Sequence, residues 1–245
     1  MNESKWKTCD SPRVLLHYLC EKLLEDRHWK GLNCWEAMAR FPQIGFVMLA
    51  SWQRVAEITR SQSLAQGLRM VEQRLEMARM KDIPDRSKFI ESLPVEAAKT
   101  VSMACGTHVA LTLGRLREQV GSMAQRQARF RDERNGLYQV AFRNEARIQS
   151  DIIRDVFGNP FHPLWKKGNA YRSKTNVQRW AQSNNGTVVK MTQTIDQERR
   201  FELIPILADA LEEDGCNDAD ILDHCRNGKP HVRGCWVVEL FREQP

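Results

Sequence analysis

The sequence predicts an all-α protein: a helical N-terminal body followed by a compact C-terminal unit of about four short helices. Apolar residues recur three and four positions apart along most of the 245 residues, which is the spacing of helices. They rarely alternate with polar residues, so no strand is indicated. Hydrophobic residues make up 42% of the chain, enough to bury the core of one large domain or two small ones.

We expect three segments along the chain. They are a helical body over residues 1–157, with a weak internal boundary near 82–93, a basic aromatic tether over 158–186, and a C-terminal helical unit over 187–245. The net charge of +6 is unevenly spread, because residues 187–245 hold 7 Lys and Arg against 12 Asp and Glu. A basic body and an acidic unit can dock on each other, or the body can bind an anionic partner.

Capping residues and helix breakers set the expected helices of the N-terminal body. Ser11 followed by Pro12 predicts a helix start, and Pro42 predicts the end of a short helix that begins near Asn33. Asn135-Gly136 predicts a stop, and Gly158 predicts the end of the next helix. The longer helices expected here span residues 44–60, 63–81, 94–134 (one helix or two) and 137–157.

The C-terminal unit has the clearest start and stop signals of the chain. They predict helices over residues 187–199, 206–213, 219–226 and 235–242. The apolar spacing within these helices predicts a shared core of Ile206, Leu207, Leu211, Ile221, Leu222, Cys225, Trp236, Val237 and Leu240.

Two parts of the chain are similar to an uncharacterised bacterial family of many paralogues, sometimes filed near repeat-companion-domain hypothetical proteins. The N-terminal match includes Trp6, Cys9, Asp10 and Pro12. The stronger match comprises Phe157-Gly158-Asn159-Pro160-Phe161, and residues 185–190, 203–212, 218–226 and 231–240. The stretch 162–184 is longer and more basic than this resemblance implies. No established activity comes with the family.

Cys216, Cys225, His231 and Cys235 form the candidate metal set, spaced C-x8-C-x5-H-x3-C. Four nitrogen and sulfur ligands would suit tetrahedral zinc. A helix over residues 219–226 argues against this set, because a rise of 1.5 Å per residue separates Cys216 from Cys225 by about 13 Å. We therefore interpret the cysteines as reduced core residues and expect neither metal nor cofactor.

A catalytic interpretation starts from Asp220 and His224, which lie four residues apart on the expected helix. Asp220 could orient the imidazole, with Cys225 or Cys235 as the nucleophile. However, His224 and Cys225 point about 100° apart on a helix, and Asp220 serves the helix N-terminus. No oxyanion motif, phosphate loop or paired-carboxylate signature accompanies them. We expect the protein not to be an enzyme.

Residues 156–195 contain no Asp or Glu, and their basic residues alternate with aromatic ones. Such a stretch can bind nucleic acid through phosphate contacts and base stacking. It can also lie against the acidic C-terminal unit, with two tryptophans as anchors. The candidate binding residues are Lys166, Lys167, Arg172, Lys174, Arg179, Lys190, Trp165, Tyr171 and Trp180.

These observations favour a non-catalytic cytoplasmic module for protein interaction or regulation, with an unidentified protein partner. Nucleic-acid binding through residues 161–190 is the alternative, and a zinc-stabilised C-terminal module is a more remote one. No membrane partner is expected. No apolar run approaches the roughly 20 residues that span a bilayer, and the N-terminus has no apolar signal segment.

Overall fold

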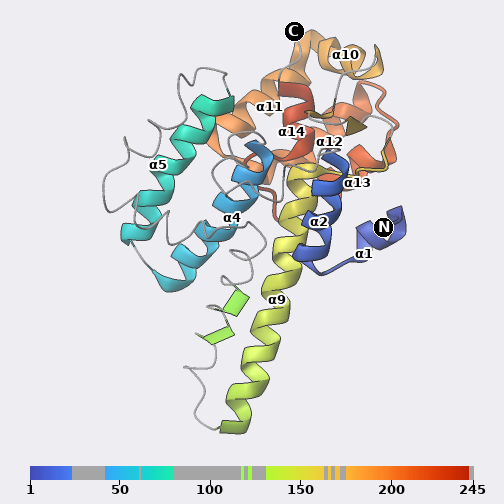
Figure 1. Cartoon of the computed structure of the whole chain (residues 1–245). Helices are drawn as coiled ribbons and strands as arrows, with labels where there is room; N and C mark the ends of the chain where they lie inside the picture. Colours follow the sequence, from blue (N-terminus) through green and yellow to red (C-terminus); the bar gives the residue numbers. More distant parts are fainter. Residues whose placement is uncertain are drawn as a thin grey trace. The chain divides into compact units, whose positions relative to one another are not determined.

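A computed structural model describes residues 1–23, 42–60, 62–79, 117–118, 121–122, 131–162, 165–166, 169–171 and 175–242 (Figure 1). The chain divides into two compact units. The terminal unit comprises Met1–Thr8 with Asp151–Pro245, and the middle unit comprises Cys9–Ser150. The structure thus divides the chain differently from the three segments expected, because the first eight residues group with the C-terminal helices.

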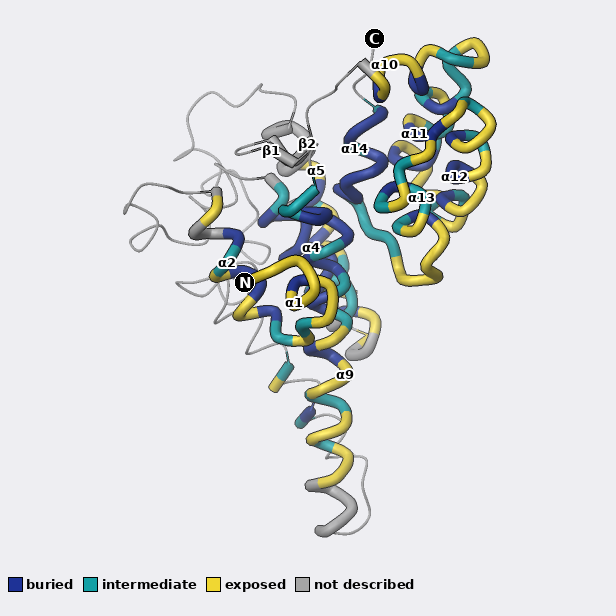
Figure 2. The backbone as a smooth tube through the Cα atoms, turned by 90° about the vertical axis from the view of Figure 1, so that its right-hand side faces the viewer, coloured by how far each residue is buried: buried dark blue, intermediate teal, exposed yellow. Residues whose placement is uncertain are grey.

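The middle unit is helical where it is described. It contains α2 (Pro12–Leu23), α4 (Pro42–Thr59) and α5 (Gln62–Arg79), which confirms three expected helices to within two residues. α4 packs against α5. Residues 44–51 of α4 are all buried, which explains why their sequence is apolar without a polar stripe (Figure 2). The short helix expected before Pro42 and most of the 94–134 segment lie outside the described residues.

The expected stop at Asn135-Gly136 is wrong. α9 runs without a break from Arg131 to Phe157, and Gly136 lies inside it. A glycine inside a helix costs about 1 kcal/mol relative to alanine, which a helix of 27 residues tolerates when its other residues favour the helical state. The helix ends as expected at Gly158, which has a φ of 65°. Its last residues, from Asp151 onward, belong to the terminal unit.

The terminal unit contains a short first helix and five helices from the C-terminal part of the chain. These are α1 (Glu3–Thr8), α10 (Thr175–Gln182), α11 (Thr187–Glu198), α12 (Ile204–Glu213), α13 (Ala219–Arg226) and α14 (Trp236–Arg242), with the 3-10 turns η2 (Asn184–Gly186) and η3 (Phe201–Leu203). The last four helices match the expected ones to within two residues. The fold is all-α, as the sequence predicts.

Two very short strands are the exception to the helical pattern in the described part. β1 (Trp165–Lys166) pairs antiparallel with β2 (Asn169–Tyr171), with Trp165 opposite Tyr171. Strands of two and three residues are too short to show alternation, so the sequence gives no signal for them.

The core of the terminal unit lies among α10 to α14, and the expected core residues lie in it with two exceptions. Leu222 is only partly buried, and Ile206 is 53% exposed, so the assignment of Ile206 to the core is wrong. Ile206 follows Pro205 in the first turn of α12, where the neighbouring Leu207 takes the inward position. Val177, Trp180 and Ala181 of α10 join the same core, so part of the expected tether is integral to this unit.

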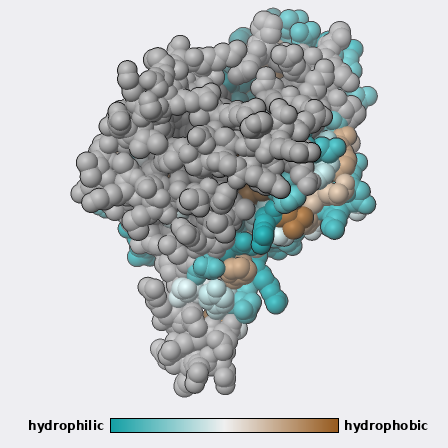
Figure 3. Space-filling view, in the orientation of Figure 1, coloured by the Kyte–Doolittle hydropathy of each residue, from teal (hydrophilic) through white to brown (hydrophobic). Residues whose placement is uncertain are grey.

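Large hydrophobic side chains rarely reach the surface of the described residues. The exposed ones are Met1, Val14, Leu137, Val140 and Ile206. Among the coloured residues on the face shown in Figure 3, the few hydrophobic patches lie next to hydrophilic residues. Among the described residues, no helix combines the length and the apolar character that a membrane span requires.

Candidate metal centre

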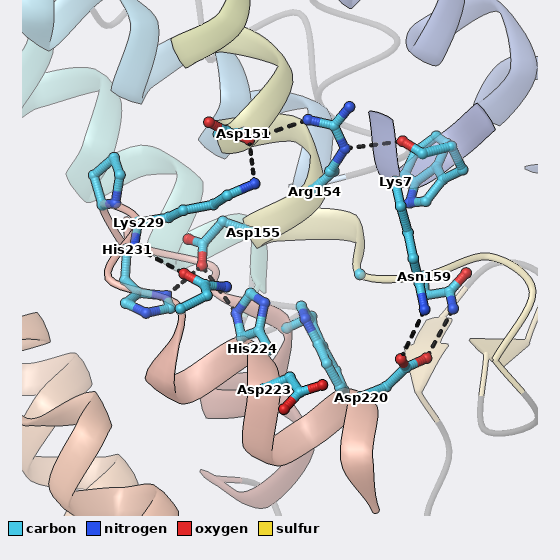
Figure 4. A pocket seen from close by; sticks show the side chains of 15 residues that line it. Lys7, Asp151, Arg154, Asp155, Asn159, Asp220, Asp223, His224, Lys229 and His231 are labelled. Atoms are coloured by element: carbon cyan, nitrogen blue, oxygen red, sulfur yellow. Dashed lines mark hydrogen bonds and ion pairs between the residues drawn. The ribbon is translucent and has the colours of Figure 1, made fainter. Parts of the chain in front are cut away.

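Four potential metal ligands converge inside the terminal unit. Asp155 comes from the end of α9, His224 from α13 and His231 from the loop that follows, as Figure 4 shows, and Cys235 immediately precedes α14. One ligand atom from each residue lies within 4.8 Å of the other three. Segments far apart in the sequence therefore bring one oxygen, two nitrogens and one sulfur to a single point.

The individual distances are close to those of a coordination sphere. Asp155 Oδ1 lies 2.7 Å from His231 Nδ1 and 3.1 Å from His224 Nε2. Cys235 Sγ lies 3.3 Å from His224 Nε2 and 3.8 Å from His231 Nδ1. Usual zinc bond lengths separate the ligands of a tetrahedral site by about 3.3–3.6 Å. The distance of 2.7 Å between Asp155 and His231 is shorter than this, and the four ligand atoms lie within 4.8 Å of one another, so metal binding would require the side chains of the cluster to rearrange.

The contacts of the imidazole nitrogens exclude a catalytic triad of Asp155, a histidine and Cys235. In a triad, the carboxylate holds one imidazole nitrogen and the nucleophile contacts the other. Here the same nitrogen of His224 faces both the Asp155 oxygen and the Cys235 sulfur, and His231 shows the same pattern. Such convergence is typical of metal ligation. The hypothetical pairing of Asp220 with His224 is also wrong, because Asp220 accepts from Lys7 and Asn159 instead.

Burial and hydrogen bonding set the protonation of the centre. Burial favours the neutral carboxyl of Asp155, but hydrogen bonds from His224 and His231 outweigh it and hold the pKa of Asp155 at about 2. Burial lowers the pKa of His224. The hydrogen bond to Asp155 raises this pKa, but by less than burial lowers it. Burial raises the pKa of the Cys235 thiol well above 9.0, and the charge of Asp155 raises it further. Without a metal, the thiol therefore keeps its proton at neutral pH.

The loop from His231 to Cys235 is fixed by its own backbone. The Val232 N–H donates to Asp155 Oδ2 at 2.8 Å, and the Cys235 N–H donates to the Val232 carbonyl at 3.0 Å. Gly234 has a φ of 86°, a conformation that glycine adopts without strain. The N–H groups of Val237 and Val238 donate to Cys235 Sγ, which favours the thiolate that a metal would bind. The loop presents its two ligands in a defined geometry.

A pocket of about 260 Å³ lies over the centre, and all of its lining residues belong to the terminal unit. Asp155, His224 and His231 line it, whereas the fully buried Cys235 does not. Trp6, Pro230 and Trp236 give the pocket apolar surface. The two histidines thus contact both the centre and a space that solvent reaches.

Charged residues of both signs surround this pocket in paired arrangements (Figure 4). Asp151 accepts from Lys229 at 2.8 Å and from Arg154 at 3.1 Å. Arg154 also donates through Nε to the carbonyl of Trp6 at 2.9 Å, which ties α1 to the end of α9. Lys7 lies 3.1 Å from Asp220 on α13.

The structure separates the members of the remote candidate metal set, which the sequence analysis argued against. Of that set, only His231 and Cys235 are at the centre. Cys216 and Cys225 lie in the hydrophobic core, where burial raises the pKa of their thiols to about 11 and about 12. Cys225 lies within α13, as the helix argument requires. The missed ligands are His224 and Asp155. The spacing H-x6-H-x3-C of residues 224, 231 and 235 was an available signal, but nothing in the sequence connects Asp155 to it.

The candidate nucleic-acid residues are not brought together as a set in the described part of the chain. Trp180 is buried in the core of the terminal unit, so the expectation that it stacks on bases is wrong. Arg179 and Lys190 are exposed, and Lys190 Nζ donates to the carbonyl of Asn185. The side chains of Trp165, Lys166 and Tyr171 are not described, and Lys167, Arg172 and Lys174 lie outside the described residues.

No protein-family model matches the chain, and neither a curated protein nor a solved structure matches it. The resemblance of the two chain ends to a bacterial paralogue family therefore stays a prediction.

Proposed function

We propose that the terminal unit is a zinc-binding module whose ligands are Asp155, His224, His231 and Cys235. The observation that carries the proposal is the convergence of their four ligand atoms within 4.8 Å of one another. Two imidazoles with a thiolate and a carboxylate suit zinc, whereas magnesium and calcium prefer oxygen ligands alone.

Charge balance supports a dication at this position. The metal-free centre buries an ionised carboxylate beside a His224 imidazole whose pKa burial lowers. Zinc bound to a carboxylate, a thiolate and two neutral imidazoles gives a centre with no net charge. A neutral centre costs less to bury than an unbalanced carboxylate. The metal would replace protons as the partner of Asp155 and Cys235.

The role that we propose for the zinc is to join elements of an already folded unit. The centre links the end of α9 to α13 and to the start of α14. The unit has a separate hydrophobic core among α10 to α14, so its folding does not depend on the metal as that of a zinc finger does. We retain the non-catalytic interaction role for this module. The buried Trp180 makes nucleic-acid binding the weaker alternative.

Metal analysis of the purified full-length protein tests the proposal. We expect about one equivalent of zinc per chain, removable by a chelator and restored by titration. The double variant His224→Ala/Cys235→Ser should bind none. Cys216→Ala is the matched control, because it removes a buried thiol of the same unit outside the centre.

The wild-type protein alone can decide the outcome if the double variant folds poorly. Chelator-treated wild type that takes up less than about one-tenth of an equivalent of zinc would end the proposal. Cobalt substitution adds a second criterion, because cobalt bound by Cys235 must show a thiolate charge-transfer band that His224→Ala alone does not remove but Cys235→Ser does.

A further inference from the structure

We propose that the metal in this centre keeps one coordination position open to the pocket, and that a small carboxylate ligand binds there. This inference rests on the zinc site proposed above. It adds a ligand-binding function to a metal that would otherwise only join helices.

The ligands are buried unequally, and this gives the centre an open side. The Cys235 side chain is fully buried and does not line the pocket. The side chains of His224 and His231 are 13% and 6% exposed, and both line the pocket. A metal held between them would have protein on its sulfur side and the pocket on the side of its imidazole ligands.

Asp155 must move away from the two imidazoles before it can act as the fourth ligand proposed above. Its Oδ1 lies 2.7 Å and 3.1 Å from the two imidazole nitrogens, closer than the separation of about 3.3 Å between oxygen and nitrogen ligands of tetrahedral zinc. Its Oδ2 accepts a hydrogen bond from the N–H of Val232, which fixes the orientation of the carboxylate. Zinc that is firmly held by His224, His231 and Cys235 can therefore accept an outside oxygen as a fourth or fifth ligand.

The pocket offers one half-exposed lysine and apolar surface to a small ligand, and because its lining also holds Asp151, Asp155, Asp220 and Asp223, the attraction for an anion would come mainly from the metal. Lys229 lies at its edge, is 46% exposed, and donates to Asp151. An ammonium group has three donors, so this bond leaves two for a ligand. Trp6 and Trp236 supply the apolar surface. The volume of about 260 Å³ is smaller than a pocket for a drug-sized molecule, which fits a short-chain carboxylate.

Cobalt-loaded full-length protein titrated with sodium acetate tests this inference, with sodium chloride holding the ionic strength constant. We expect acetate to change the visible absorption of the bound cobalt and to saturate. Lys229→Met should weaken the acetate affinity about three- to tenfold while cobalt binding is retained. Arg226→Met is the matched control, because Arg226 pairs with Asp209 and Glu212 and does not line the pocket.

The remaining outcomes separate this inference from the proposed function. If cobalt binds and acetate leaves its spectrum unchanged, the site is closed and the inference fails while the zinc proposal stands. If acetate acts equally on wild type and Lys229→Met, the acetate reaches the metal without help from Lys229, and the carboxylate site inferred from the pocket fails. If no cobalt binds, the zinc proposal itself is lost.

Discussion

Two buried carboxylates hold the same loop of the terminal unit, but their partners differ in kind. Asp155 contacts His231 and the backbone of Val232, next to His224 and Cys235. Asp196 of α11 lies 3.7 Å from the Nε of Arg233 and 3.7 Å from the Nε of Arg242. One carboxylate therefore faces groups that can bind a metal, and the other faces two guanidinium groups.

The difference lies in how the negative charge is balanced. Arginine stays protonated at any pH that a protein survives, so Asp196 keeps its positive partners. His224, one of the partners of Asp155, loses its charge more readily than an exposed histidine, because burial lowers its pKa. A carboxylate paired with arginines needs nothing more, whereas one that faces two imidazoles and a thiol is completed by a divalent cation. The comparison thus separates a structural ion pair from the proposed metal centre.

The largest effect that we expect is on metal affinity. His231→Ala should weaken zinc binding at least about a hundredfold, since it removes one of the converging ligands. Asp196→Asn should change the affinity by less than about tenfold, because Asp196 acts only through the loop. Competition with a chromogenic chelator measures both. Equal losses in the two variants would mean that the loop, and not the ligand set, determines the affinity.

The second comparison concerns the stability of the metal-free protein. Asp155→Ala should cost about 3 kcal/mol of unfolding free energy, because it leaves the N–H of Val232 and two imidazoles without their acceptor. Asp196→Ala should cost about 1–2 kcal/mol, since its arginine partners can turn toward water. Denaturant unfolding in the presence of a chelator gives both values. If Asp196→Ala lowered the unfolding free energy more than Asp155→Ala does, the carboxylate that faces the arginines would be the one on which the fold depends more.

The helices of the terminal unit could be predicted because their boundaries are set locally. Gly186, Gly215 and Gly228 all have positive φ at the expected helix ends, and Asp218 caps α13 through its contact with the Ile221 N–H. Each such signal acts within a few residues of its position. These signals lie beside the end of α12 and beside both ends of α13.

The centre could not be predicted in the same way because its parts are distant in sequence. The sequence presents His231 and Cys235 as possible metal ligands, but its spacing groups them with Cys216 and Cys225, the nearest cysteines along the chain. The ligand that completes the cluster, Asp155, is 69 residues before His224 and lies on another helix. Local helix geometry excluded the pair of Cys216 and Cys225, yet it contained no information on which remote carboxylate faces the imidazoles.

The third prediction concerns the effect of pH on the stability of the metal-free protein. The pKa of Asp155 falls from 3.8 in the unfolded chain to about 2, and burial lowers the pKa of His224 below 6.5. In both cases the unfolded chain binds the proton more tightly, so acid destabilises the fold. The contribution of these two groups to stability is fully present above pH 6.5, decreases as the pH falls below 6.5 and the unfolded chain binds the His224 proton, and decreases again between pH 3.8 and about 2.

The acidic step from Asp155 should be worth about 2 kcal/mol in the metal-free protein. Urea unfolding at a series of pH values measures it, and Asp155→Asn is the variant that should lack this step. A step of the same size in Asp155→Asn would assign the acid sensitivity to other carboxylates. Zinc binding should also strengthen with pH, because Cys235 must lose its proton to become a ligand.

The smallest effect that we expect is at Arg233, the residue that connects the two carboxylate sites. Arg233 lies between the ligands His231 and Cys235 and pairs with Asp196 at 3.7 Å, with 18% of its side chain exposed. Arg233→Gln should cost about 0.5 kcal/mol of stability, as expected of a partly solvated ion pair. It should weaken zinc binding only a few-fold, because the backbone bonds of Val232 and Cys235 still shape the loop. A change at Arg233 that abolished zinc binding without lowering stability would show that the guanidinium positions the ligands directly, and the two carboxylate sites would then act as one.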